Sequence, residues 1–301
     1  MDMPHTTIGI LGSGQLGRML VLAAAQLGVK THIFAPDANC SPAGEMATGT
    51  TSAAYDDYPA LDQFAASIDV VTSEFENVPS ETMAYLEKLR PVSPGTMALH
   101  IAQHRIREKN FAKQHGILTP DFWHIKDATS LRQAMAELQG RGVLKTCQLG
   151  YDGRGQIWID PSDDLDACFA TLGSNDAILE AAVDFVAEAS FLVARTADNR
   201  IAHFPASLNT HKNGILNRSV APAAIDKSLV ASGQEAVQRL AEAMELVGVL
   251  ALETFVTTDG KLLFNEIAPR PHNSFHWTIE GCATSQFTQL ARCLAGMPLG
   301  M

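Results

Sequence analysis

Two glutamates, Glu253 and Glu266, stand in apolar segments, 249–257 and 261–267, that are joined by Asp259-Gly260. Asp-Gly is a signal for a two-residue type I′ turn, so the segments are expected to form a hairpin that places Glu253 opposite Glu266. The same face is expected to carry Ala251, Phe255, Leu262 and Phe264. Like charges directly opposite each other destabilise a sheet, and a bound Mg²⁺, which prefers oxygen ligands, would resolve the conflict. A slipped register, or one glutamate paired with an arginine, is the alternative.

A proline-stiffened segment follows this hairpin directly and carries Arg270, His272 and Asn273. An arginine can bind a planar carboxylate or bicarbonate through two parallel hydrogen bonds. Each of these residues alone could be an ordinary capping or surface group. Beside a metal site, the combination indicates a site for a small oxyanion.

A glycine-rich segment from Gly150 to Gln156 lies between two short predicted strands, and Lys145 ends the first of them. Alternating glycines leave the backbone bare, as a flap that closes over a polyphosphate requires. Lys145 and Arg154 supply positive charge for phosphate oxygens. An exposed hairpin loop is the alternative, but such loops rarely also carry a tyrosine, an arginine and a preceding strand lysine.

Another glycine-rich segment, Gly12-Ser13-Gly14-Gln15-Leu16-Gly17, follows a predicted strand and opens a helix. Its glycines allow backbone N–H groups to approach an anion, which the helix N-terminus also attracts. Three interpretations stay open: a dinucleotide site with Asp37 as the acidic partner, a phosphate of another ligand, or a tight turn without a ligand.

The elements around these motifs form two patterns. The first ninety residues alternate strand and helix, which favours a parallel sheet with crossover helices. Strands are expected at 7–11, 31–34 and 70–72, and helices at 15–27 and from Ser80 onward.

A helix at about 103–115 then leads into a compact α/β segment, after which the strands lengthen and become antiparallel around a helix at 226–246. The expected organisation has three units, 1–120, 121–182 and 183–301.

Composition restricts the class of protein. The chain has 301 residues, a net charge of −11, 46% hydrophobic and 18% charged residues. Such values exclude disorder and argue against binding of nucleic acid or an anionic membrane surface. We find no secretory signal and no apolar run long enough to span a bilayer. The five cysteines lack C-x-x-C spacing, so we expect free thiols in a cytoplasmic protein, with neither a disulfide framework nor a zinc site.

The strand lysine, glycine-rich flap and paired glutamates, in this order, resemble the ATP-grasp superfamily. Longer motifs are similar to those of the 5-(carboxyamino)imidazole ribonucleotide synthases of purine biosynthesis, over about residues 7–300. These motifs are Gly12–Met19, Glu74–Pro79, Gly150–Gln156, His211–Leu216 and Asn265–Ser274.

The resemblance implies an α/β (overall α+β) ATP-grasp fold behind an N-terminal Rossmann-like, pre-ATP-grasp domain. Residues 1–120 would form that domain and a linker helix, 121–182 the small lid domain, and 183–301 the domain that carries the metal and bicarbonate sites. The implied reaction joins ATP, bicarbonate and 5-aminoimidazole ribonucleotide, through carboxyphosphate, into the N-carboxylated ribonucleotide, ADP and phosphate.

The resemblance also implies residue roles. Glu253 and Glu266 would bind Mg²⁺, while Arg270, His272 and Asn273 would hold bicarbonate. Tyr151, Arg154 and Glu74 would orient the ribonucleotide. The ATP site would comprise Arg105, Lys145, Gly150, Tyr151, Asp152, Gly153, Arg154, Gly155, Gln156, Glu180, Ala181, Ala182, Val183, Glu188, His211, Asn265 and Glu266, with Lys109 a weaker candidate. Within this set, 180–183 would surround adenine and Glu188 would bind the ribose. In this picture the loop at Gly12 would line the substrate cleft.

Two departures from the family pattern stand out. Leu149 occupies the first glycine position of the flap, and family members continue beyond the position of Met301 with a segment that helps to bind the substrate phosphate. The family usually forms homodimers. The alternatives are another ATP-grasp ligase such as a formate-dependent glycinamide ribonucleotide transformylase, a nicotinamide oxidoreductase, and a non-catalytic nucleotide-binding protein.

Overall fold

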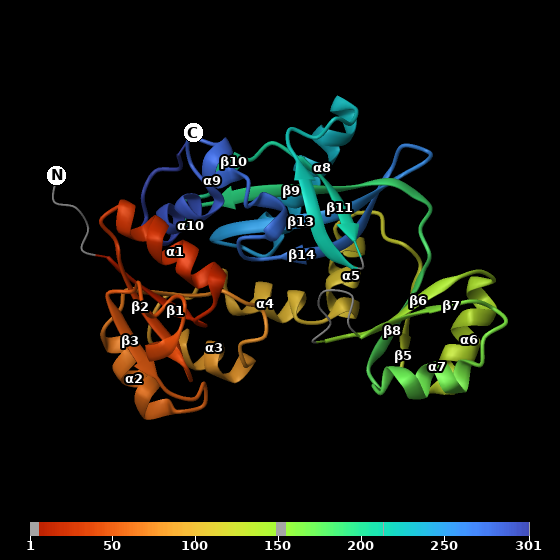
Figure 1. Ribbon diagram of the computed structural model, residues 1–301, viewed down its shortest axis with the longest axis horizontal. Coiled ribbons are helices and arrows are strands. Elements are labelled where there is room, and N and C mark those ends of the chain that lie inside the picture. Colours follow the sequence, from red (N-terminus) through yellow and green to blue (C-terminus); the bar gives the residue numbers. More distant parts are fainter. Residues whose placement is uncertain (1–5, 149–154, 213, 301) are drawn as a thin grey trace.

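Three β-sheets form the framework of the computed structural model, which describes residues 6–148, 155–212 and 214–300 (Figure 1). The N-terminal sheet lies at the lower left of the view, and a small unit spanning residues 122–181 lies at the lower right. The C-terminal sheet lies above and between them.

The N-terminal sheet is parallel, with the strand order β3-β2-β1-β4. Its elements are β1 (Thr7–Leu11), α1 (Gln15–Gln26), β2 (Lys30–Ala35), η1 (Ala38–Cys40), β3 (Gly49–Ser52), α2 (Tyr58–Ala66), β4 (Val70–Ser73) and α3 (Ser80–Leu86). Strand β3 was not expected, because its sequence, Gly-Thr-Thr-Ser, lacks the alternation of apolar and polar residues that signals a strand.

The helix expected at 103–115 is α5 (Arg105–Gln114), and a helix that was not expected, α4 (Thr96–Ala102), precedes it. The break falls at His104, which has an extended backbone and caps α5 by accepting a hydrogen bond at Nδ1 from the Ile106 N–H (3.3 Å).

The small unit is an antiparallel sheet with the strand order β5-β8-β6-β7 and two helices. Its elements are β5 (Phe122–Ile125), α6 (Ala128–Leu138), β6 (Gly142–Thr146), β7 (Gln156–Ile159), α7 (Leu165–Leu172) and β8 (Ala177–Ala181). Its apolar core is formed by its own residues, among them Leu131, Leu144 and Leu179.

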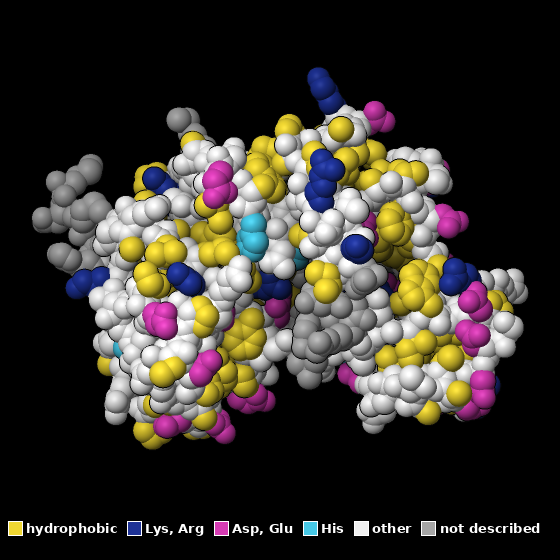
Figure 2. All heavy atoms as spheres, in the orientation of Figure 1, with side chains coloured by type: hydrophobic (Ala, Val, Ile, Leu, Met, Phe, Trp, Pro, Cys, Tyr) yellow, Lys and Arg dark blue, Asp and Glu magenta, His cyan; other side chains and the backbone are white. Residues whose placement is uncertain are grey.

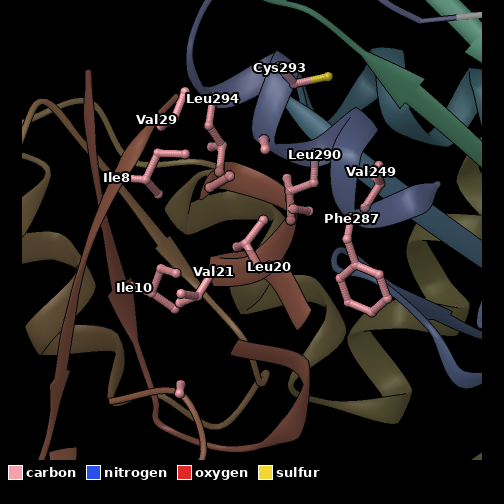
Figure 3. Packing of buried hydrophobic residues seen from close by; sticks show 14 of the residues in the cluster. Ile8, Ile10, Leu20, Val21, Val29, Val249, Phe287, Leu290, Cys293 and Leu294 are labelled. Atoms are coloured by element: carbon pink, nitrogen blue, oxygen red, sulfur yellow. The ribbon is translucent and has the colours of Figure 1, made fainter. Parts of the chain in front are cut away.

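The C-terminal sheet is antiparallel, with the strand order β12-β11-β9-β13-β14 and β10 paired to β9. Its elements are β9 (Phe185–Arg195), β10 (Ile201–His203), β11 (Ser207–Lys212), β12 (Ile215–Val220), α8 (Lys227–Ala243), β13 (Gly248–Thr257), β14 (Leu262–Ala268), η2 (Asn273–Phe275), α9 (Thr278–Gly281) and α10 (Gln286–Leu294). The packing between α10 and α1 joins this sheet to the N-terminal one (Figure 3). Phe287 and Leu290 of α10 share one core with Ile8, Leu20 and Val21.

The hairpin of β13 and β14 pairs Glu253 with Glu266 as expected, but by a different route. The turn is not the expected two-residue one: the Thr257 N–H donates to the Lys261 carbonyl (2.9 Å) across a three-residue loop in which Gly260 has a φ of 74°. Asn265 then forms a bulge that has no partner on β13 and restores the register.

The loop and bulge also correct the expected face of two residues. Leu262 and Phe264 pack with Leu250 and Leu252 in the core beneath α8, on the side of the sheet away from Glu253. Within β14, only Glu266 and the residues after the bulge lie on the faces of the sheet that were expected for them.

On the face shown in Figure 2, Lys and Arg side chains are scattered among Asp and Glu side chains and do not gather into one area. Within the described parts of the chain, no helix combines the length and apolar character that crossing a membrane requires.

Candidate active site

A pocket of about 440 Å³ lies where the small unit, helix α5 and the C-terminal sheet meet. Its volume is in the range of small-molecule sites. The sequence-predicted residues that line it are Arg105, Lys145, Gln156, Glu180, Ala181, Ala182, Val183, Glu188, His211, Glu253, Asn265, Glu266, Arg270, His272 and Asn273. The fold thus brings together residues that are spread over most of the chain.

Glu180, near the end of β8, pairs with the positively charged side chains on one wall of the pocket. Its Oε2 lies 3.0 Å from Lys145 Nζ and 3.3 Å from the Nζ of the fully buried Lys109. Burial alone would raise the pKa of Glu180, but Lys109, Lys145 and Arg105 bring it down to about 2. Glu180 is therefore ionised and pairs with both lysines.

The opposite wall carries Glu253 on β13 and Glu266 on β14. Ligand atoms of these two glutamates and of His272 all lie within 4.8 Å of one another. Burial, and then the charge of Glu266, raise the pKa of Glu253 to about 7. The pKa of Glu266 is lowered, because the surrounding charges, that of Arg105 first, together outweigh the effect of burial. Arg105 Nη1 lies 3.7 Å from Glu266 Oε2.

Neighbouring side chains hold Glu253 in place. Ser190 donates a hydrogen bond to Glu253 Oε1 (2.9 Å), and Asn209 Nδ2 donates to the Ser190 hydroxyl (2.6 Å). The raised pKa of Glu253 means that nearby protein groups do not fully neutralise the negative charge of its ionised carboxylate. This oxygen-rich donor set fits a hard divalent cation such as Mg²⁺.

A third carboxyl, Glu108, is buried behind Glu266 and was missed in the sequence. Its Oε1 accepts a hydrogen bond from the Ile267 N–H, and burial raises its pKa to about 8. The group is thus neutral at pH 7 and adds no third negative charge. The available signal was the spacing of Arg105, Glu108 and Lys109, which places them on one face of a helix.

An apolar slot continues the pocket toward the small unit. The rings of Phe185 and Phe255 stack with centroids 4.8 Å apart, and Trp158 lines the side of the small unit. Beyond the slot, Glu188 Oε2 pairs with His211 Nδ1, and this bond raises the pKa of His211. Phe255 lines the pocket with Glu253, on whose face it was expected, whereas sequence reasoning missed Phe185 and Trp158, which belong to two other strands.

The loop after β14 places Arg270, His272 and Asn273 beside Glu266 in the pocket wall. Arg270 Nη2 pairs with Glu76, a residue that sequence reasoning left without a role. Burial, and then the charge of Arg270, lower the pKa of His272 to about 4, so its imidazole is neutral at pH 7. The loop therefore presents one guanidinium beside a neutral ring.

Glu74 lies elsewhere, at the N-terminus of α1. Its carboxylate accepts hydrogen bonds from the N–H groups of Gly14 and Gly17 (Gly17 N to Oε2, 2.6 Å). A Cβ atom at Gly12 would lie 2.5 Å from Glu74 Cγ, so the glycine is needed for this close approach. The chain's own carboxylate thus takes the N–H groups that a dinucleotide phosphate would need.

Part of the predicted flap, Leu149, Gly150, Tyr151, Asp152, Gly153 and Arg154, lies outside the described residues. Its described end begins at Gly155, whose φ is 68° and whose carbonyl accepts a hydrogen bond from the Thr146 N–H (2.9 Å). Gln156 then opens β7 at the edge of the pocket.

Comparisons with known proteins agree on one family. Residues 5–103 match the family model of the ribonucleotide synthetase preATP-grasp domain, and residues 110–287 match that of the ATP-grasp domain. The chain is 46% identical to the N5-carboxyaminoimidazole ribonucleotide synthase of Brucella melitensis, over 99% of this chain and 82% of that protein. The corresponding enzyme of Bacillus subtilis is 39% identical over 99% and 78%.

Solved structures give the same result. The N5-carboxyaminoimidazole synthetase of Staphylococcus aureus complexed with ADP is 34% identical with a TM-score of 0.93, over 98% of this chain and 78% of that one. The Aspergillus clavatus enzyme in complex with ADP and 5-aminoimidazole ribonucleotide is 27% identical with a TM-score of 0.90, over the same shares. This chain belongs to the N5-carboxyaminoimidazole ribonucleotide synthases, a family of ATP-grasp enzymes.

Proposed function

We propose that this protein carboxylates the amine of 5-aminoimidazole ribonucleotide, using ATP and bicarbonate and releasing ADP and phosphate, as a ligase of purine biosynthesis. The observation that supports this most strongly is the single pocket in which the facing pair Glu253 and Glu266 meets Lys145, Arg105 and the loop of Arg270.

ATP would occupy the side of the pocket that the small unit covers. Residues 180–183 and the stacked rings of Phe185 and Phe255 offer an apolar slot for adenine, and Glu188 can accept hydrogen bonds from ribose hydroxyls. Lys145 and Arg105 then hold the phosphates. Mg²⁺ held by Glu253 and Glu266 would neutralise the charge of the transferring phosphoryl group.

Bicarbonate would bind to Arg270, His272 and Asn273, next to the γ-phosphate position. An oxygen of bicarbonate attacks the γ-phosphorus and ADP leaves, which gives carboxyphosphate. The amine nitrogen then forms a bond to the carboxyl carbon, phosphate leaves, and the amine loses a proton. Neutral His272 adds no second positive charge beside Arg270, so the cation that this loop offers to the oxyanion is Arg270, which also pairs with Glu76.

Glu74, Tyr151 and Arg154 are proposed to orient the ribonucleotide. For Glu74 this requires its carboxylate to exchange the N–H groups of Gly14 and Gly17 for the substrate. A homodimer and a cytoplasmic location, which the family resemblance implies, belong to the same proposal, and light scattering of the purified protein tests the dimer.

The decisive experiment measures ADP release from MgATP and bicarbonate, with and without 5-aminoimidazole ribonucleotide. We expect strong stimulation by the ribonucleotide, and its loss in Glu266→Gln. Glu242→Gln, an exposed carboxylate on α8, is the matched control and should retain full activity. Stimulation by glycinamide ribonucleotide and formate instead would overturn the proposed substrate.

A further inference from the structure

A second cluster of metal-ligating side chains lies at the joint between the small unit and α5. Its members are His104 at the N-terminus of α5, Cys147 just after β6 and Asp176 just before β8. One ligand atom of each lies within 4.8 Å of the other two. His124, on β5, extends the cluster, since its Nε2 lies 2.8 Å from Asp176 Oδ1.

The backbone holds the cluster in place. The Cys147 N–H donates to the Asp176 carbonyl (2.9 Å), and the Arg105 N–H donates to the Cys147 carbonyl (3.0 Å). His104 Nε2 lies 3.1 Å from Asp176 Oδ2, so one carboxylate already bridges both imidazoles. Three parts of the small unit and one end of α5 are therefore fixed around a common point.

The exposure of the cluster gives an ion a route to it. Cys147 is 2% exposed, whereas the side chains of Asp176 and His124 are 38% and 36% exposed. The thiol is thus shielded on the inner side, and the carboxylate and imidazole open to solvent on the outer side. A buried soft ligand with an open approach satisfies the requirement for an entry path.

The donor types select the ion. A thiolate, two imidazoles and a carboxylate form a tetrahedral set typical of Zn²⁺, while Mg²⁺ avoids sulfur. With Zn–S and Zn–N bonds of about 2.3 and 2.0 Å, ligand atoms around one ion lie roughly 3.3–3.6 Å apart. The ligand atoms of His104, Cys147 and Asp176 need only side-chain shifts to reach that spacing, and the His124 ring must move from its contact with Asp176 toward the other two ligands. Cysteine spacing alone could not reveal the set, which is why a zinc site was not expected from the sequence.

We propose that His104, Cys147 and Asp176, with His124 as the fourth ligand, bind Zn²⁺ and that the ion fastens the small unit to α5. Binding replaces the hydrogen bonds of Asp176 with metal bonds, moves the proton of each imidazole from Nε2 to Nδ1, and releases the thiol proton to solvent. At His104 this gives up the 3.3 Å cap on the Ile106 N–H. Because Arg105 follows His104 and Lys145 precedes Cys147 by two residues, the ion would fix the spacing of two proposed phosphate-binding residues.

Cobalt spectroscopy tests the proposal directly. The protein is stripped with a chelator and titrated with Co²⁺ in excess Mg²⁺, so that hard oxygen sites are already occupied. We expect a thiolate-to-cobalt charge-transfer band and strong visible bands of tetrahedral Co²⁺, saturating at one equivalent and abolished by Zn²⁺. Absence of the thiolate band in the unmodified protein would overturn the site.

Variants then assign the ligands. Cys147→Ser should lose the thiolate band, whereas Cys168→Ser, which changes another thiol of the small unit, should keep it. His104→Asn and His124→Ala should each weaken Co²⁺ binding at least about tenfold. A band that survives Cys147→Ser would refute the assignment. Unchanged affinity in His124→Ala would remove that residue from the site.

Hydrogen exchange tests the fastening without using catalysis. Zn²⁺ should slow amide exchange in β6 and β8 of the unmodified protein and leave Cys147→Ser unchanged; equal exchange with and without Zn²⁺ would refute the fastening. Glu266→Gln should lose ribonucleotide-stimulated turnover but keep the cobalt signal, so the failure of one proposal is distinguishable from the failure of the other.

Discussion

The N-terminal sheet and the small unit are attached to the C-terminal sheet in opposite ways. The N-terminal sheet shares an apolar core with it, in which Ile8 and Leu20 pack with Phe287 and Leu290 (Figure 3). The core of the small unit consists of its own residues. The first and last parts of the chain thus form one body, while the middle part is a separate one.

Polar contacts join the small unit to this body. Lys109 of α5 pairs with Glu180, and His104 pairs with Asp176. Buried apolar contacts favour a single arrangement, whereas ion pairs can be exchanged for contacts with a charged ligand. The comparison indicates that binding at the pocket can reposition the small unit but not the N-terminal sheet.

The largest expected effect comes from breaking the shared core. Phe287→Ala should lower the free energy of unfolding of the body by about 3–5 kcal/mol, because it leaves a cavity between two sheets. Leu131→Ala, the matched change in the small unit, should accelerate amide exchange only there. Calorimetry and hydrogen exchange measure both. A loss spread over the whole protein in Leu131→Ala would show that the two bodies unfold together.

A smaller effect is expected at the polar joint. Lys109→Met removes one of the two lysines that neutralise Glu180, and breaking such a buried pair costs about 3 kcal/mol, at the low end because Lys145 remains. ATP affinity should fall together with stability. Lys113→Met, an exposed lysine on the same helix, is the control. Equal effects of the two substitutions would refute a special role for Lys109.

The two bodies should also differ in their response to pH. In metal-free protein the pKa of Glu253 is raised to about 7, so between its ordinary value and 7 the unfolded carboxyl is ionised and the folded one is not. Stability of the body should therefore fall as pH rises through this window, by up to about 3 kcal/mol.

Glu180 gives the small unit the opposite dependence. Its pKa is lowered to about 2, so the stability it contributes is lost as pH falls below its ordinary value. Thermal unfolding from pH 2 to 8, with and without Mg²⁺, measures both trends. Glu253→Gln should reduce the first trend, to which the buried Glu108 (pKa about 8) also contributes, and should leave the second trend unchanged. An unchanged first slope in that variant would contradict the assignment.

The smallest effect is expected on the outer surface of the small unit. Arg141 Nε lies 2.8 Å from Asp160 Oδ1, and both side chains are about half exposed. Asp160→Asn should change the free energy of unfolding by less than about 1 kcal/mol, because water competes for both charges. Urea unfolding followed by Trp158 fluorescence measures it, and a larger loss would mean that this edge contributes to the joint.

The parts of the site that depend on neighbouring segments of the sequence could be predicted. The pairing of Glu253 with Glu266 follows from two strands and a turn, although the predicted turn was one residue too short. The error did not propagate, because the bulge at Asn265 compensated for it. A bulge cannot be recognised from the alternation of apolar and polar residues. The correct pairing therefore resulted from two errors that cancelled, a turn predicted one residue too short and a bulge that was not predicted.

The parts that could not be predicted depend on contacts between distant segments. Glu108 meets Glu266 across more than half the chain, and Glu76 meets Arg270 across a similar separation. The shared core of α1 and α10 is likewise set by tertiary packing, since either amphipathic helix could have covered its own sheet alone. Neither composition nor periodicity records which distant partner a residue will meet.

The carboxylate of Glu74 at the glycine loop has a consequence for ligand selection. Because it belongs to the chain, it competes with any free anion for the N–H groups of Gly14 and Gly17 at a high effective concentration. Free phosphates at ordinary cellular concentrations therefore compete poorly with the Glu74 carboxylate for these N–H groups. A loop whose sequence suits many nucleotides is thereby reserved for a ligand that makes enough contacts elsewhere to displace Glu74.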